Sequence, residues 1–140
     1  LYKENNLYEF EVTYRKLLKQ SISWLLVLMF GAALAGSVIF PFLEERIYAE
    51  NLPLFGAAVI TMAVFIFGYV FQYGLYTTTR DSSIIASNLA GLVVAALTLV
   101  PLASYTPYWA VTASLLIGSG TATVLKYRKW AATRRELLLA

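Results

Sequence analysis

Four long segments that contain no charged side chain dominate this sequence. They cover residues 22–43, 54–75, 84–104 and 108–125. An α-helix needs about 20 consecutive apolar residues to cross a hydrocarbon core of about 30 Å. A helix on the surface of a water-soluble bundle keeps a polar face, which these segments lack. The sequence therefore predicts an all-α, polytopic integral membrane helical bundle with four transmembrane helices.

The composition agrees with a lipid environment. Of the 140 residues, 59% are hydrophobic and 14% are charged, whereas soluble domains contain about 45–50% apolar and about 25% charged residues. A small soluble domain cannot bury that much apolar surface. The chain has no Cys and no His, which removes the usual soft metal ligands and the commonest general base. We therefore expect no metal site and no cofactor.

Basic residues are distributed unevenly between the two ends of the predicted spans. Four spans place both termini on one side, so ten of the eleven Lys and Arg residues fall on that side and Arg46 alone on the other. Basic flanks stay in the cytoplasm. We expect a multi-pass protein of the cell inner (cytoplasmic) membrane with both termini cytoplasmic. A cytoplasmic or interfacial lead-in (1–21) precedes the transmembrane domain (22–125), and a basic cytoplasmic tail (126–140) follows it.

Small residues recur at every fourth position of the last span, at Ala110, Ser114, Gly118 and Ala122. Such a face allows another helix to approach closely. It predicts helix packing within a bundle and carries no chemistry of its own.

The stretch "QYGLYTTTRDSS" holds the only charged residues between positions 51 and 125, Arg80 and Asp81. Arg80 is expected to keep this turn in the cytoplasm. Asp81, or one of the two serines after it, is expected to cap the next helix by accepting its free N–H groups. Gln72 and Asn88 lie at similar depth on either side of the turn. They form either an interhelical hydrogen bond or part of a hydrophilic path.

Catalysis is not expected. Glu44 and Glu45 are neighbours in a short loop, which favours a solvated patch over an acid–base pair held across a substrate. The "GSG" at 118–120 lies within a span and follows no strand, so it is not a phosphate loop. The Lys and Arg residues lie where topology requires them, so no nucleic-acid partner is expected.

The same features also occur in a characteristic order. A basic lead-in, "YRKLLKQSISWLLVL", enters a span that ends in "FPFL", and the loop "EERIYAENLPLFG" follows. The next span ends in "FQYGLYTTTRDSSIIASNLAGLVV", and the last span precedes a basic tail. From about Tyr8 to Arg135 the chain resembles the C-terminal region of polysaccharide biosynthesis proteins, the lipid-linked oligosaccharide (O-antigen) flippases of the MATE-like MOP superfamily. It departs from that family at "YTPYWAVTAS", where a glycine-rich entry is common.

The resemblance implies four helices of a larger MOP-type transporter. Such a flippase moves an undecaprenyl-diphosphate-linked sugar across the cytoplasmic membrane by alternating access. Its partners are the lipid bilayer, the lipid-linked oligosaccharide and the remaining helices. Arg80, Gln72, Asn88 and Asp81 are then the substrate-path candidates.

Two further expectations concern the chain as a whole. It begins at Leu1 and ends in "ELLLA", so we expect a piece of a longer protein. The alternative function is that of a self-contained four-helix membrane accessory or assembly protein without transport activity.

Overall fold

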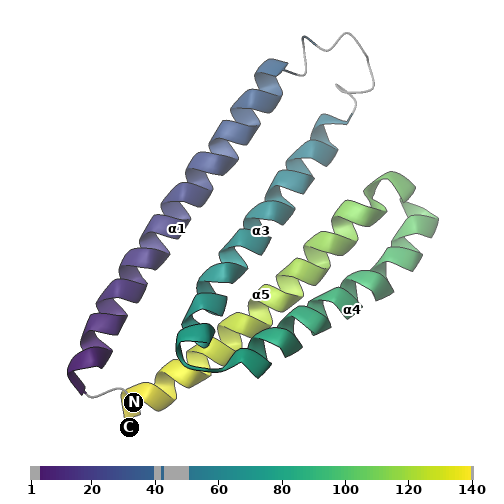
Figure 1. Ribbon diagram of the computed structural model, residues 1–140. Helices are drawn as coiled ribbons and strands as arrows, with labels where there is room; N and C mark the ends of the chain where they lie inside the picture. The colour runs from purple at the N-terminus through teal and green to yellow at the C-terminus, as the bar shows by residue number, and fades with distance from the viewer. Residues whose placement is uncertain (1–3, 40–41, 43–50, 140) are drawn as a thin grey trace.

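Four long helices form the structure. The computed structural model describes residues 4–39, 42 and 51–139, and within these ranges the chain contains no strand. The helices are α1 (Glu4–Ile39), α3 (Leu52–Thr77), α4 (Asp81–Tyr105) and α5 (Pro107–Leu139) (Figure 1). All four are long and apolar enough to cross a membrane. The predicted all-α fold with four membrane-spanning helices is confirmed.

The first and last helices extend well beyond the predicted spans. The lead-in is continuous with the first span in α1, and most of the basic tail is continuous with the last span in α5. Neither extension contains the residues that end helices, since residues 4–30 and 121–139 include no Gly and no Pro. Pro107 begins α5, a position where its missing N–H costs no helical hydrogen bond.

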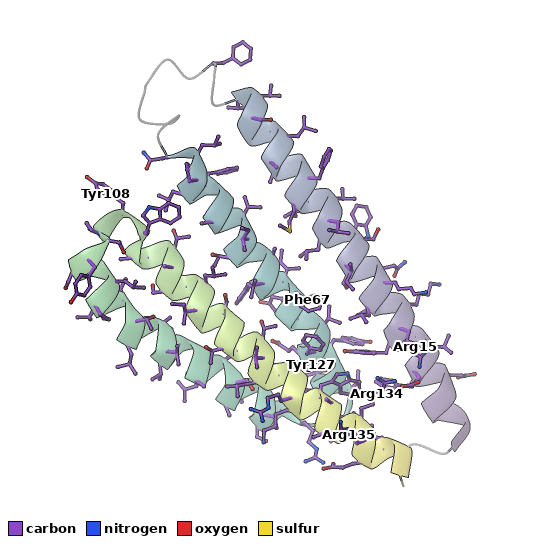
Figure 2. All side chains as sticks on the ribbon, turned by 180° about the vertical axis from the view of Figure 1, so that it is seen from behind. Arg15, Phe67, Tyr108, Tyr127, Arg134 and Arg135 are labelled. Atoms are coloured by element: carbon purple, nitrogen blue, oxygen red, sulfur yellow. The ribbon has the colours of Figure 1, made fainter. Side chains whose placement is uncertain are left out.

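The helices alternate in direction, so both termini lie at the same end of the bundle (Figure 1). We call this the basic end, because Arg15, Arg134 and Arg135 gather there while Tyr108 lies at the opposite end (Figure 2). Helix α3 lies between α1 and the closely packed pair of α4 and α5 (Figure 1).

The turn between α3 and α4 is held by a backbone motif. Arg80 N–H donates to Leu75 O and Thr79 N–H donates to Tyr76 O, both at 3.0 Å, which is the Schellman pattern. Thr79 occupies the left-handed region with φ 56°. Arg80 takes the N-cap position of α4, and no side-chain hydrogen bond caps this helix. The predicted capping by the Asp81 side chain or the next two serines is therefore wrong. Asp81 is instead the first residue of α4, where its carboxylate suits the positive end of the helix.

Two glycines bring α4 and α5 into backbone contact. A Cβ atom added at Gly118 would lie 2.5 Å from Gly91 O, and one added at Gly91 would lie 2.6 Å from Gly118 O. Only glycine at both positions permits this approach. The buried residues of α3 all lie from Ala63 onward, and those of α4 end at Gly91, so in these two helices the core lies toward the basic end.

Candidate functional site

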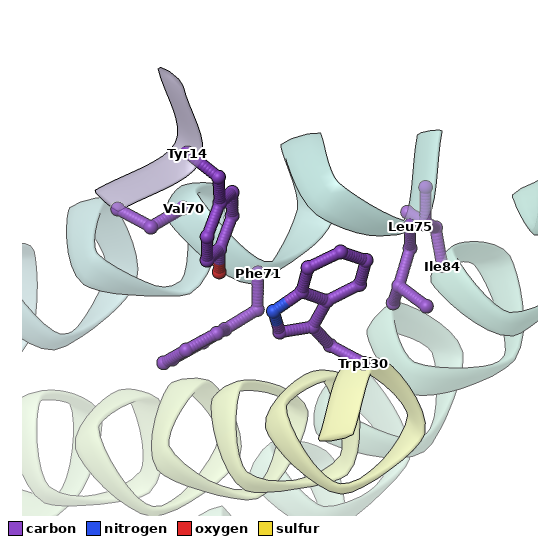
Figure 3. Close-up of a cluster of buried hydrophobic side chains, with 6 residues drawn as sticks. All are labelled: Tyr14, Val70, Phe71, Leu75, Ile84 and Trp130. Carbon is purple, nitrogen blue, oxygen red and sulfur yellow. The ribbon is translucent and has the colours of Figure 1, made fainter. Parts of the chain in front are cut away.

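An aromatic and aliphatic cluster joins all four helices at the basic end (Figure 3). Trp130 of α5 is 4% exposed and its ring centroid lies 4.8 Å from that of Tyr14 of α1. The ring also covers Gly74 of α3, where an added Cβ would lie 2.9 Å from the indole. The buried members of this cluster are Tyr14, Val70, Phe71, Leu75, Ile84 and Trp130.

Ion pairs surround this cluster. Arg134 of α5 contacts the carboxylate of Glu11 of α1 through two of its nitrogens, and Glu11 also pairs with Arg15 at 3.3 Å. Arg80 of the α3–α4 turn donates to Glu136 of α5 at 2.8 Å. Together with the cluster, these contacts tie α1, the α3–α4 turn and α5 together at the basic end.

Lys126 of α5 is the buried cation of the structure's described part. The residue is 5% exposed, and its Nζ donates to Oε1 of Gln72 of α3 at 2.9 Å. The same Nζ lies 5.8 Å from the centre of the Tyr69 ring, within the range of a cation–π attraction. Within residues 4–39, 42 and 51–139 no carboxylate pairs with this amine.

A pocket of about 260 Å³ lies beside Lys126, between α3, α4 and α5. Gln72 and Asn88 give it two side-chain amides, and the remaining lining is largely apolar. Ser119 and Thr123 also line it, but their hydroxyls donate to the backbone oxygens of Leu116 and Val64. We call this the Lys126 pocket. It is a largely apolar recess that holds one amine and two side-chain amides.

The four substrate-path candidates divide into two pairs. Gln72 and Asn88 both line the Lys126 pocket. They form no hydrogen bond with each other in the described structure, since Gln72 accepts from Lys126 instead, so the predicted interhelical bond between them is wrong. Arg80 and Asp81 do not line this pocket. Arg80 pairs with Glu136, and Asp81 is exposed in the first turn of α4.

The sequence analysis does not single out Lys126, because a basic residue directly after a span is expected from topology alone. The sequence signal for the burial of Lys126 is the four-residue repeat of α5, which continues beyond the small residues to Lys126 and Trp130. A repeat of four drifts by roughly 40° per step around an α-helix with 3.6 residues per turn. The stripe therefore turns from α4 toward α3 as it approaches the basic end. All of its members are buried: Ala110, Ser114, Gly118, Ala122, Lys126 and Trp130.

The small-residue face of α5 is occupied within the chain. Gly118 lies against Gly91 and Ala95, and the Ala122 methyl group lies against Gly91, all on α4. Ala110 and Ser114 are 2% and 3% exposed. This face is therefore not free to bind a second chain.

Comparisons with known proteins return no match for this chain. No protein-family model matches it, and neither a curated protein nor a solved structure matches it.

Proposed function

We propose that this chain is part of a flippase that moves a lipid-linked oligosaccharide across the cytoplasmic membrane. The observation that carries the proposal is the Lys126 pocket, in which an amine and two amides meet within long apolar helices. Ionisable side chains are costly inside a membrane and mark substrate or ion pathways. A polar head group that crosses lipid needs such a recess. The chain then acts by binding and transport rather than by catalysis.

The uneven packing of the helices supports alternating access. Ion pairs and the aromatic cluster hold α1, α3 and α5 together at the basic end. Residues 52–62 of α3 contain no buried residue, whereas α5 is buried as far as Ser114 and Ala110 toward the opposite end. A helix such as α3, which is fixed at one end and loosely packed at the other, can rock about the fixed end, as the halves of such transporters do.

The apolar surface of the chain supports a larger assembly. In the most apolar window of each helix, between 6% and 22% of the residues are buried inside the chain. The remaining surface contacts lipid or the further helices of the parent transporter. The alternative, an accessory protein that assembles through its small residues, loses its docking face because that face of α5 is packed against α4.

Deletion of the gene in its host tests this function. We expect lipid-linked oligosaccharide to accumulate in the inner leaflet and surface polysaccharide to fall, because the head group cannot cross lipid unaided. Accessibility of the oligosaccharide to an externally added lectin, together with the total lipid-linked pool, measures both effects. Re-expression of the gene is the control. An unchanged leaflet distribution and unchanged surface polysaccharide would contradict the flippase function.

Single cysteines test the proposed cytoplasmic location of the basic end. The chain has no Cys, and Thr79 and Thr106 are exposed at opposite ends of α4. We expect Thr106→Cys to react with a membrane-impermeant maleimide in intact spheroplasts and Thr79→Cys to react only after lysis. Labelling of Thr79→Cys before lysis, without labelling of Thr106→Cys, means that the orientation is inverted.

A further inference from the structure

We propose that the Lys126 pocket binds the phosphate or diphosphate group of an anionic amphiphile. The inference rests on the proposed transport function and names the part of the substrate that this chain holds. It also assigns the phosphate to Lys126 and not to Arg80 or the N-terminus of α4.

The first argument is charge. The Lys126 ammonium has three protons to donate, and in the described structure only Gln72 Oε1 accepts one of them. No carboxylate compensates its charge within the described residues. A buried charge without a counter-ion is costly in protein and in lipid. An anion in the adjacent pocket removes that cost.

The second argument is the chemistry of the other polar groups. An ammonium only donates, so Gln72 must turn its oxygen to Lys126. This leaves the NH₂ group of Gln72 without a hydrogen-bond partner among the described residues. Asn88 also lines the pocket and makes no side-chain hydrogen bond in the described structure. Both amides can donate to phosphate oxygens, and hydrogen bonds to an ionised group are the stronger kind. A metal cation is disfavoured because no carboxylate lines the pocket.

The third argument is the apolar remainder of the pocket. Phe65, Leu92 and Leu115 line it away from the polar groups. Gln72 lies five residues before Thr77, the last residue of α3, which places it roughly 8 Å inside that helix end at 1.5 Å per residue. A phosphate that carries an apolar tail fits both halves of the pocket, whereas inorganic phosphate uses only one.

Arg80 is the weaker candidate for the same group. Its guanidinium already pairs with Glu136 at 2.8 Å, and it is 52% exposed. It does not line the pocket. Its charge is compensated and solvated, whereas Lys126 is 5% exposed and pairs with no carboxylate among the described residues.

Lipid retention by the purified full chain tests the site. The probe is undecaprenyl phosphate at a fixed mole fraction in dodecyl maltoside micelles, and native mass spectrometry counts the lipid retained. We expect Lys126→Gln to weaken retention by about ten-fold, since a hydrogen-bonded charge contributes that much. Lys129→Gln is the matched control, because Lys129 is exposed on the same helix, and it should retain the wild-type affinity.

Asn88→Ala is the second variant, since Asn88 is exposed and its truncation leaves the helix packing intact. We expect it to weaken retention by about three-fold or more. Circular dichroism of each variant reports its helicity. Equal retention by wild type and both pocket variants overturns the site.

Two further measurements distinguish inorganic phosphate from the phosphate group of a lipid, and one lipid from another. Excess inorganic phosphate should leave the bound lipid in place, and complete displacement by it overturns the amphiphile. Phosphatidylglycerol should be retained less than undecaprenyl phosphate. If both lipids are retained equally and Lys126→Gln releases both, the phosphate site stands and the isoprenoid substrate of the proposed flippase does not. The result of the gene-deletion experiment does not depend on these lipid-retention results. Failure of the proposed transport function and failure of the proposed phosphate site can therefore be distinguished.

Discussion

Replacement of Gly118 with leucine is expected to separate α4 from α5 and to lower the free energy of unfolding by about 3 kcal/mol, the upper part of the usual overpacking range. An added Cβ would lie 2.5 Å from Gly91 O and 2.7 Å from the Ala95 Cβ atom. Neither a backbone oxygen nor a methyl group can rotate out of the way. The two helices must therefore move apart along the interface.

Gly120 provides the matched control for this substitution. It lies on the same helix two residues further on, and an added Cβ there meets nothing within 4 Å. Both substitutions gain the same helix propensity, about 0.8–1.0 kcal/mol for the loss of glycine, so the difference between them isolates the contact with α4. Unfolding by sodium dodecyl sulfate, followed by circular dichroism in mixed micelles, measures that difference. Equal midpoints for Gly118→Leu and Gly120→Leu contradict the close approach of α4 and α5.

The interface between α4 and α5 also shows which parts of the fold can be predicted from the sequence. Long uncharged segments have one stable solution in lipid, a helix that satisfies its own backbone, so four spans follow directly from the sequence. The repeat from Ala110 to Ala122 likewise identifies a face. It does not identify the partner of that face, because periodicity fixes the rotation of one helix and says nothing about its neighbour. That the partner is Gly91 is a fact of tertiary packing.

The lead-in and the tail were harder to predict for a physical reason. Basic and aromatic residues that alternate beside a span suit a helix on the membrane surface and a helix that continues the span equally well. The choice depends on distant contacts, such as Tyr14 with Trp130 and Glu11 with Arg134. No local pattern contains these pairs.

The candidate site was predicted in part. Gln72 and Asn88 stand out as amides in apolar segments, and both line the Lys126 pocket. Arg80 stands out as an isolated charge, but its partner Glu136 lies 56 residues away in the sequence. Lys126 does not stand out in the sequence, because it is one of several basic residues that follow the last span. Lys126 is buried because the buried stripe on α5 turns from α4 toward α3. This can be recognised only when the positions of both α3 and α4 are known.

Truncation of Trp130 to alanine is expected to have the second large effect. Trp130 is 4% exposed and its ring contacts Tyr14 and Phe10 of α1 at centroid distances of 4.8 and 5.9 Å. Loss of a buried Trp side chain costs about 3–5 kcal/mol in soluble cores. Among the contacts of the aromatic cluster, this ring is the link between α1 and α5. We therefore expect the lead-in of α1 to detach locally before the rest of the bundle unfolds.

Hydrogen exchange with mass spectrometry locates that detachment. Amide exchange over residues 9–18 should rise in Trp130→Ala, whereas exchange over residues 84–105 of α4 should stay at the wild-type rate. Trp24→Ala is the control, because Trp24 lies on α1 but is 71% exposed, so its loss removes equal aromatic surface without opening the cluster. The ion pair between Glu11 and Arg134 remains in both variants. Its partly exposed groups contribute at most about 1 kcal/mol, too little to hold the lead-in alone. Unchanged exchange over residues 9–18 in Trp130→Ala would show that the aromatic cluster does not anchor α1, and the closed basic end that the proposed alternating access requires would then need another origin.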